Sequence, residues 1–162
     1  MIKSKYLIIS LLLISSFTYA QKKKSVEVFN GRGLFDKSDK ILDLSHQNLK
    51  TVPIEANNPN LEVLILDNNL FNELPSWIGN LKNLKILSIK NNNLKEINLA
   101  IVYCENLEQL YLSGNKKLSD ISSITTCNNL EIIDVVDTKI REIPMSIQTM
   151  DNLCYFKYSK EQ

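Results

Sequence analysis

Four stretches of the chain share one pattern: LEVLILDNNLF at residues 61–71, LKILSIKNNNL at 84–94, LEQLYLSGNKKL at 107–118 and LEIIDVVDTKI at 130–140. The dipeptide Asn-Leu precedes or opens each unit, at 60–61, 83–84, 106–107, 129–130 and 152–153, so the interval is always 23 residues. After each Leu, positions four and six are apolar, position nine carries an amide or a hydroxyl, and position eleven or twelve is apolar again. A fixed period that aligns equivalent residues indicates a repeat architecture.

The pattern extends in both directions along the 162 residues. DKILDLSHQNL at 39–49 fits a first unit of 22 residues, and LCYFKY at 153–158 begins a sixth strand. We therefore divide the chain into units at 39–60, 61–83, 84–106, 107–129 and 130–152, a partial unit at 153–158 and a C-terminal tail at 159–162.

The pattern L-x-x-L-x-L-x-x-N-x-L resembles the leucine-rich repeat family. The second half of a unit, LPSWIGNL at 74–81, is similar to the 23-residue group typified by Ras-binding and plant intracellular repeat proteins, and Val52-Pro53 and Ile143-Pro144 match that tail too. Units three and four depart from it, with Ile97-Asn98 and Ile121-Ser122 in place of Leu-Pro. The resemblance implies an α/β solenoid: a short curved horseshoe with a parallel concave sheet of about six strands.

Elementary physics gives the same architecture. Side chains at positions four and six of a strand point to one face, and those at three and five point to the other. One unit cannot bury its apolar face alone, so the units must stack. Position nine holds a column of polar residues that we expect to bond the turn backbone of the adjacent repeat, weakly at its two ends. This column contains Gln47, Asn69, Asn92, Asn115 and Thr138.

The first twenty residues have the order of a secretory signal peptide. A basic start with Lys3 and Lys5 is followed by an apolar run and by Thr18-Tyr19-Ala20, which has small residues where a signal peptidase cleaves. The run is shorter than the roughly 20 residues of a membrane-spanning helix. We predict cleavage near Ala20, a secreted, periplasmic or cell-surface location, and no stable membrane anchor afterwards.

The two ends of the repeats need covers. Residues 21–38 are the candidate N-terminal cap, with a short edge strand expected at 25–29. At the other end we expect a weakly covered edge with Phe156 and Tyr158 as its plug, which allows weak self-association through that edge.

Charge argues against nucleic acid as a partner. Without the two lysines of 1–20, 17 basic residues face 18 acidic ones. This near-neutral balance gives no basic footprint for nucleic acid or for an anionic membrane.

Candidate chemistry is weak. His46 lies beside Asp43 and Ser45, which suggests a hydrolytic triad, but these are ordinary strand and turn positions of one unit. One His and three dispersed Cys lack the paired spacing of a zinc site. The runs 67–69 and 31–33 are only fragments of calcium and phosphate loops. We expect no enzyme activity and no cofactor.

The cysteines allow two interpretations. Cys104 and Cys127 are 23 residues apart at position 21 of neighbouring units, where they are either two small buried side chains or an inter-repeat disulfide. Cys154 is at position two of the last strand.

Function is expected on the concave face. Position three reads Ile41, Val63, Ile86, Gln109, Ile132 and Tyr155, and position five reads Asp43, Ile65, Ser88, Tyr111, Asp134 and Lys157. An apolar stripe with polar groups at its edge is typical of a protein contact, although β-branched residues also favour strands on their own account. We predict an exported module that binds a protein or peptide here. The alternative is a carbohydrate or surface-polymer binder, for which more aromatic residues at position three are expected. A small hydrolase is the weakest alternative.

Overall fold

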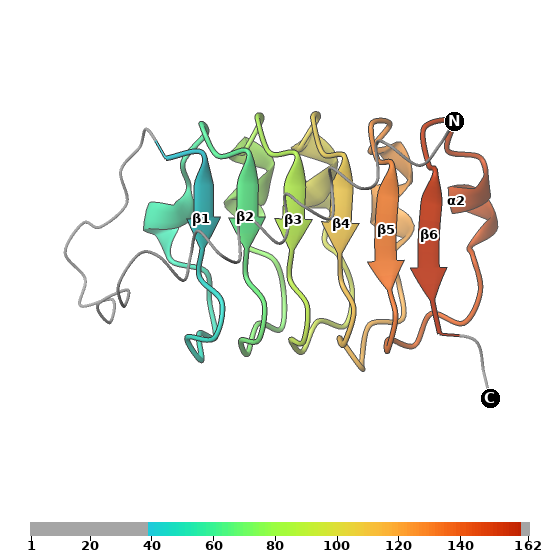
Figure 1. Cartoon of the computed structure of the whole chain (residues 1–162), viewed down its shortest axis with the longest axis horizontal. Coiled ribbons are helices and arrows are strands. Elements are labelled where there is room, and N and C mark those ends of the chain that lie inside the picture. Colours follow the sequence, from blue (N-terminus) through green and yellow to red (C-terminus); the bar gives the residue numbers. More distant parts are fainter. Residues whose placement is uncertain (1–38, 160–162) are drawn as a thin grey trace, which may run out of the picture. The chain divides into compact units, whose positions relative to one another are not determined.

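The computed structural model describes residues 39–159. The predicted signal peptide at 1–20, the N-terminal cap at 21–38 and residues 160–162 of the tail lie outside this range. The described part contains one sheet of six parallel strands in the order β1-β2-β3-β4-β5-β6 (Figure 1). The strands are β1 Ile41–Asp43, β2 Val63–Ile65, β3 Ile86–Ser88, β4 Gln109–Tyr111, β5 Ile132–Val135 and β6 Tyr155–Tyr158. The predicted sheet is confirmed.

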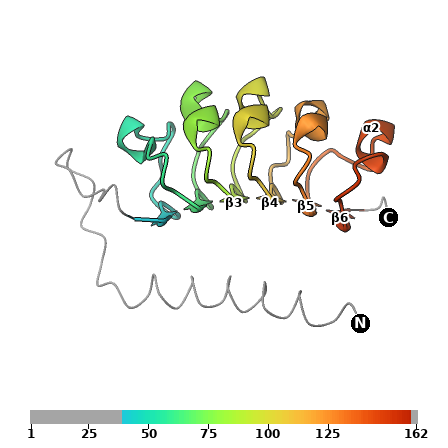
Figure 2. The ribbon, with the colours of Figure 1, turned by 90° about the horizontal axis from the view of Figure 1, so that it is seen from above.

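Short helical segments return the chain from one strand to the next. They are η1 Ile54–Ala56, η2 Ser76–Asn80, η3 Leu99–Tyr103, η4 Ser122–Thr126 and α2 Met145–Gln148, and all but the last are 3₁₀ turns. Figure 2 shows them in a row on one side of the sheet, which bends so that the opposite face is concave. Among residues 39–159, none of these helices has the length and apolar content needed to cross a membrane.

Proline sets the start of three of these segments. Pro53, Pro75 and Pro144 occupy the N-cap positions with φ between −66° and −54°. Their fixed φ and missing N–H suit a helix start. In unit three Asn98 replaces proline, accepts a hydrogen bond from Ala100 N at 3.0 Å and so caps the segment with its side chain.

In unit four an aspartate supplies the corresponding contact. Asp120 Oδ1 accepts a hydrogen bond from Ser122 N at 2.8 Å, and the hydrogen bonds from Ser122 lower the pKa of Asp120. The two units that depart from the Leu-Pro pattern therefore begin their segments through side-chain acceptors.

The core lies between the sheet and the helical segments. Strand positions four and six point into it, and Leu64, Leu66, Leu87 and Leu110 have no exposed surface. At the end of the stack, Phe156 and Tyr158 pack against this core with ring centroids 5.9 Å apart, as expected of a plug.

The predicted amide column at position nine is confirmed. Asn69 Oδ1 accepts from the backbone N–H groups of Gln47 and Leu49 at 3.1 and 2.9 Å, and its Nδ2 donates to Leu44 O at 2.8 Å. Asn92 and Asn115 bond the repeat before them in the same way. Each asparagine thereby satisfies turn backbone that the stacking has buried.

The column weakens at its ends, as predicted. In the described part of the chain, the Thr138 hydroxyl bonds only within its own repeat, donating to Val135 O at 2.7 Å and accepting from Ile140 N at 3.1 Å. Gln47 contributes its backbone N–H to the column, and no contact of its side chain is found within residues 39–159.

A second amide column, which the sequence did not explain, runs along the edge where the strands begin. It uses the Asn that precedes each strand Leu. The Nδ2 atoms donate to the backbone carbonyl of the residue 24 positions earlier, at 2.9 Å for Asn83 and 2.7 Å for Asn106, Asn129 and Asn152. The invariant Asn-Leu dipeptide is therefore a stacking contact between repeats.

Candidate functional site

The concave face is formed by strand positions three and five, in register across all six strands. Ile41 is opposite Val63, Val63 opposite Ile86, and the alignment continues through Gln109 to Ile132 and Tyr155. The position-five residues pair in the same order. Neighbouring strands lie about 4.8 Å apart, so side chains in one column touch. The twelve residues singled out by sequence thus form two continuous columns.

Exposure varies along these columns. The outermost apolar positions, Ile41 and Tyr155, are 46% and 50% exposed, and Lys157 is exposed as well. Val63, Ile65, Ile86, Asp43 and Asp134 are half-buried, whereas Ser88, Gln109, Tyr111 and Ile132 are buried. The two ends of the face are therefore its most accessible apolar parts.

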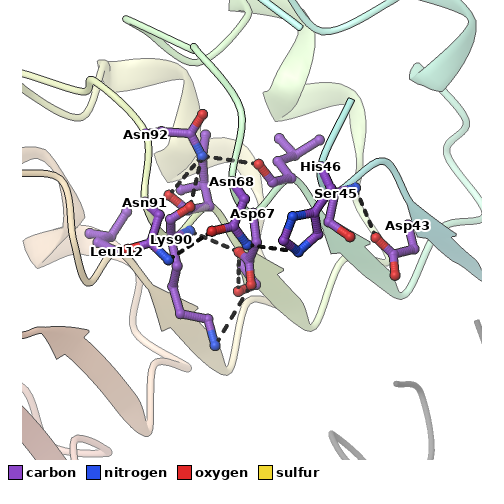
Figure 3. Close-up of polar contacts among 12 residues, drawn as sticks. Asp43, Ser45, His46, Asp67, Asn68, Lys90, Asn91, Asn92 and Leu112 are labelled. Carbon is purple, nitrogen blue, oxygen red and sulfur yellow. Dashed lines mark hydrogen bonds and ion pairs between the residues drawn. The ribbon is translucent and has the colours of Figure 1, made fainter. Parts of the chain in front are cut away.

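A polar network lies at the edge of the face where β2 and β3 end (Figure 3). Asp67 Oδ1 accepts hydrogen bonds from Ser88 Oγ at 2.7 Å and from Lys90 N at 2.8 Å, and its Oδ2 lies 3.7 Å from Lys90 Nζ. Burial raises the pKa of Asp67 despite these hydrogen bonds, and the Asp43 carboxylate adds to the rise. The carboxylate thereby fixes Ser88 and the backbone of Lys90.

Lys90 connects this network to Tyr111. Its Nζ lies 5.3 Å from the centroid of the Tyr111 ring, a cation–π distance, and the Tyr111 hydroxyl donates to Gln109 Oε1 at 3.0 Å. Burial raises the pKa of Tyr111, and the charge of Asp134 raises it further. Tyr111 is thus a neutral aromatic side chain held in one orientation.

Asp67 and Lys90, at position seven, were not among the residues predicted from the sequence for the concave face, which came from positions three and five only. The signal was present, because the alternation that points positions three and five outward also points position seven outward. Both side chains lie in the network at the concave face, at the edge where the strands end.

The opposite edge carries an ion-pair ladder. Lys40 Nζ and Lys85 Nζ lie 2.6 and 3.0 Å from the two oxygens of Glu62. Hydrogen bonds from Lys40 and then Lys85 lower the pKa of Glu62, and the hydrogen bond to Glu62 raises the pKa of Lys85. The two lysines are exposed and Glu62 is partly exposed, so the ladder contributes to the polarity of this edge more than to stability.

The candidate triad does not come together as catalysis requires. Asp43 Oδ1 accepts from Ser45 N at 2.9 Å, while His46 Nε2 lies 3.1 Å from Asn68 Nδ2 (Figure 3). His46 and Asn68 belong to a position-eight column with φ of 59° and 56°, a left-handed turn conformation. Their contact is part of the repeat. Among residues 39–159, no three side chains of the metal-ligating types gather at one point.

Cys104 and Cys127 are buried free thiols in this structure. Cys104 Sγ donates to Ile78 O at 3.2 Å, and Cys127 Sγ donates to Ile101 O at 3.8 Å. Burial raises the pKa of Cys104 to about 12 and that of Cys127 to about 11. Each thiol therefore stays protonated and hydrogen-bonds the preceding repeat.

The fold and this surface define a class: the protein is a short leucine-rich-repeat solenoid with six parallel strands. Residues 59–116 match the family model described as leucine rich repeat. No curated protein matches the chain. The support for the leucine-rich repeat family therefore comes from that match and from solved structures.

Among solved structures, internalin C2 from Listeria monocytogenes is 30% identical, with a TM-score of 0.66 over 76% of this chain and 53% of its own. The leucine-rich-repeat ectodomain of the receptor kinase SOBIR1 from Arabidopsis thaliana is 28% identical, with a TM-score of 0.60 over 72% of this chain and 67% of its own. The plant peptide hormone receptor RGFR1, in complex with RGF2, is 26% identical, with a TM-score of 0.54 over 76% of this chain and 25% of its own.

The chain spans about half the length of internalin C2, at 53%. Its fold and these relatives support a protein-interaction module. They support no enzyme class, because the leucine-rich repeat is typically an interaction fold.

Proposed function

We propose that this protein is an exported interaction module that binds a protein or peptide along its concave face. The observation that carries the proposal is the register of the six strands, which joins positions three and five into one continuous surface. Solenoids use such extended concave surfaces for binding. RGFR1, which is structurally similar to this chain, is a peptide hormone receptor, and this supports a peptide or protein as the ligand.

Tyr111 lies on a central strand of the proposed surface, with 8% of the residue exposed. Its ring is fixed by Lys90 and its hydroxyl by Gln109, so little side-chain freedom is left to lose on binding. Tyrosine is also enriched among the residues that dominate binding energy. Ile86, which is half-buried, and Ile132, which is 6% exposed, lie in the column beside it. The more accessible apolar area is at Ile41 and Tyr155, at the two ends of the face.

The test is affinity capture from an extracellular or periplasmic fraction, followed by measurement of binding to the captured protein. Replacing Ile86, Tyr111 and Ile132 by Ser should weaken binding at least about tenfold, as loss of a hot-spot tyrosine does. Far-UV circular dichroism checks that the variant stays folded. Unchanged affinity of the folded variant would show that the concave face does not bind the captured protein.

A matched control uses apolar residues on the other side of the sheet. Ile54, Leu99 and Met145, in the helical segments, are 61%, 72% and 80% exposed. Replacing these three by Ser also removes three large apolar side chains, here from the helical segments, and we expect it to leave binding unchanged.

Export is part of the proposal. It is supported by the n-region, apolar run and small-residue site that end at Ala20. The SOBIR1 ectodomain, a relative outside the cell, is consistent with it. N-terminal sequencing of the exported chain should start at Gln21, and a chain that retains Met1 contradicts cleavage.

Two finer assignments remain proposals. The Leu-Pro tails at Pro75 and Pro144 favour the 23-residue Ras-binding and plant intracellular subgroup by repeat type. Weak self-association through β6 would use an edge strand with an exposed Tyr155. A strictly monomeric mass at high concentration in light scattering would exclude self-association.

A further inference from the structure

The turn that follows β4 departs from the backbone bonding of the repeats before it. In the preceding repeat, the position-ten N–H of Asn93 donates to Phe71 O at 2.9 Å, and the position-eleven N–H of Leu94 donates to Asn115 Oδ1 at 3.1 Å. The same two bonds exist one repeat earlier, from Leu70 N and Phe71 N. The repeat thus normally satisfies both main-chain donors of this turn.

In the fourth repeat the two equivalent donors, the N–H groups of Lys116 and Lys117, make neither of these bonds. Its turn is one residue longer, so Leu118 takes the apolar slot and donates to Asn115 O at 2.9 Å. The next repeat has Thr138 in place of the asparagine that would reach back, and its hydroxyl donates within its own repeat. Within residues 39–159, the N–H groups of Lys116 and Lys117 therefore donate to no protein acceptor.

These two residues line a hollow of about 390 Å³, together with Gly114 and a row of three asparagines at 91–93. Gly114 has φ +78° and carries no side chain, whereas the same column has Asn68, Asn91 and Asp137 in other repeats. A Cβ at Gly114 would lie 2.0 Å from Asn91 Oδ1, so a side chain here would displace that of Asn91, and with glycine the column of side chains is interrupted.

The two lysine side chains are also unpaired. Both are exposed and form no ion pair within the described chain, whereas Lys82, Lys85 and Lys90 each lie within 4 Å of a carboxylate. Successive main-chain N–H groups beside ammonium groups form a concavity suited to an oxyanion.

We propose that this hollow binds the carboxylate of an acidic side chain presented by the protein partner. The inference rests on the proposed function and deepens it, since it assigns a charge to part of that partner. The turn directly follows β4, which carries Tyr111, so a peptide on the concave face can extend to the hollow where β4 ends. An acidic residue there would receive the two unused N–H groups and the charge of both lysines.

The experiment is a titration of the ¹⁵N-labelled full chain with acetylated, amidated hexaglutamate, followed by two-dimensional NMR. The amide signals of Gly114, Lys116 and Lys117 and the side-chain amide of Asn93 should shift together and saturate. Hexaglutamine should give no shift, and added salt should weaken the binding because exposed charges are screened. Equal shifts with hexaglutamine, or shifts confined to other residues, would overturn the assignment.

A pair of variants tests the lysines. K116Q/K117Q should raise the Kd for hexaglutamate about fivefold or more, since each exposed charge contact contributes modestly. K40Q/K82Q removes the same charge from the other edge of the sheet and should leave the Kd unchanged. If both variants raise the Kd equally, the binding depends on the overall charge of the protein and not on this hollow, and the proposed site is wrong.

Two further arms separate this inference from its alternatives. Tighter binding of polygalacturonate than of hexaglutamate would replace the peptide by an acidic polysaccharide and overturn the proposal. The variant with Ser at Ile86, Tyr111 and Ile132 should keep the shifts of Lys116 and Lys117. If that variant also keeps its partner, the concave-face function fails while the carboxylate hollow stands; if the shifts vanish in a folded variant, the hollow fails.

Discussion

Replacing Asn92 by Ala tests how the amide column holds the repeats together. The side chain makes four hydrogen bonds: Oδ1 accepts from Phe71 N at 3.0 Å, and Nδ2 donates to Leu66 O, Ile89 O and Lys90 O at 3.0, 3.3 and 3.0 Å. Three of these contacts are redundant, because those carbonyls also accept from Asn69, Asn115 and the backbone N–H of Asn68. Only the Phe71 N–H loses its sole partner.

The expected cost follows from that count. A buried N–H without a partner costs about 1–3 kcal/mol, and weakening three shared bonds adds about 1 kcal/mol in total. We therefore expect Asn92→Ala to lower the free energy of unfolding by about 2–4 kcal/mol. Urea unfolding followed by far-UV circular dichroism measures this, and hydrogen exchange should show the Phe71 amide losing its protection first.

The control is Gln47→Ala in the same column, where no side-chain contact is found within residues 39–159. It should change stability by less than about 0.5 kcal/mol, as surface substitutions do. A loss below about 1 kcal/mol for Asn92→Ala, or an equal loss for Gln47→Ala, would refute the reasoning from unpaired backbone groups.

Three further predictions concern packing, thiols and pH. Gly79→Ala should destabilise the fold by about 1–3 kcal/mol through overpacking, because its Cβ would lie 2.7 Å from Ala100 O; urea unfolding would contradict this by showing no loss. Iodoacetamide at about pH 8 should modify the exposed Cys154 in the native chain. It should reach Cys104 and Cys127 only in urea, because both are buried and their raised pKa values leave little thiolate. In the same mass spectra, a pair that alkylates only after reduction would establish the disulfide instead. The raised pKa of Asp67 means that its protonated form favours folding, so this contribution is complete below the unfolded pKa and is lost as pH rises through the folded one. The stability of Asp67→Asn relative to the parent should therefore increase from below about pH 4 to about pH 7, and a pH-independent difference would contradict it.

Much of the fold could be predicted because the spacing and alternation of residues in each repeat determine where the strands lie and which side chains are buried. The 23-residue spacing placed the strands, and the alternation inside LEVLIL at 61–66 placed Leu64 and Leu66 in the core. The position-nine asparagines predicted the amide column. The second column, through Asn83 and its equivalents, was visible as a dipeptide, yet its acceptor is 24 residues away and only stacking brings it within 2.9 Å.

The candidate site was less predictable. Register followed from the repeat, so Ile86, Gln109 and Ile132 were correctly expected to share a column. The alternation also points Asp67 and Lys90 outward, but the contacts that join their side chains lie between neighbouring repeats. Contacts between residues in different repeats carry no signal within a single unit.

The sequence by itself determined that this protein is a stack of near-identical units with a parallel sheet and two faces, because periodicity alone decides which side chains point inward. The tertiary structure decided what the exceptions do. The longer turn at Lys116 and Lys117 and the threonine at position 138 are minor irregularities in the sequence. Only when repeats four and five lie side by side does it emerge that two backbone donors have no protein acceptor within residues 39–159, because hydrogen bonding depends on distance in space and not on spacing along the chain.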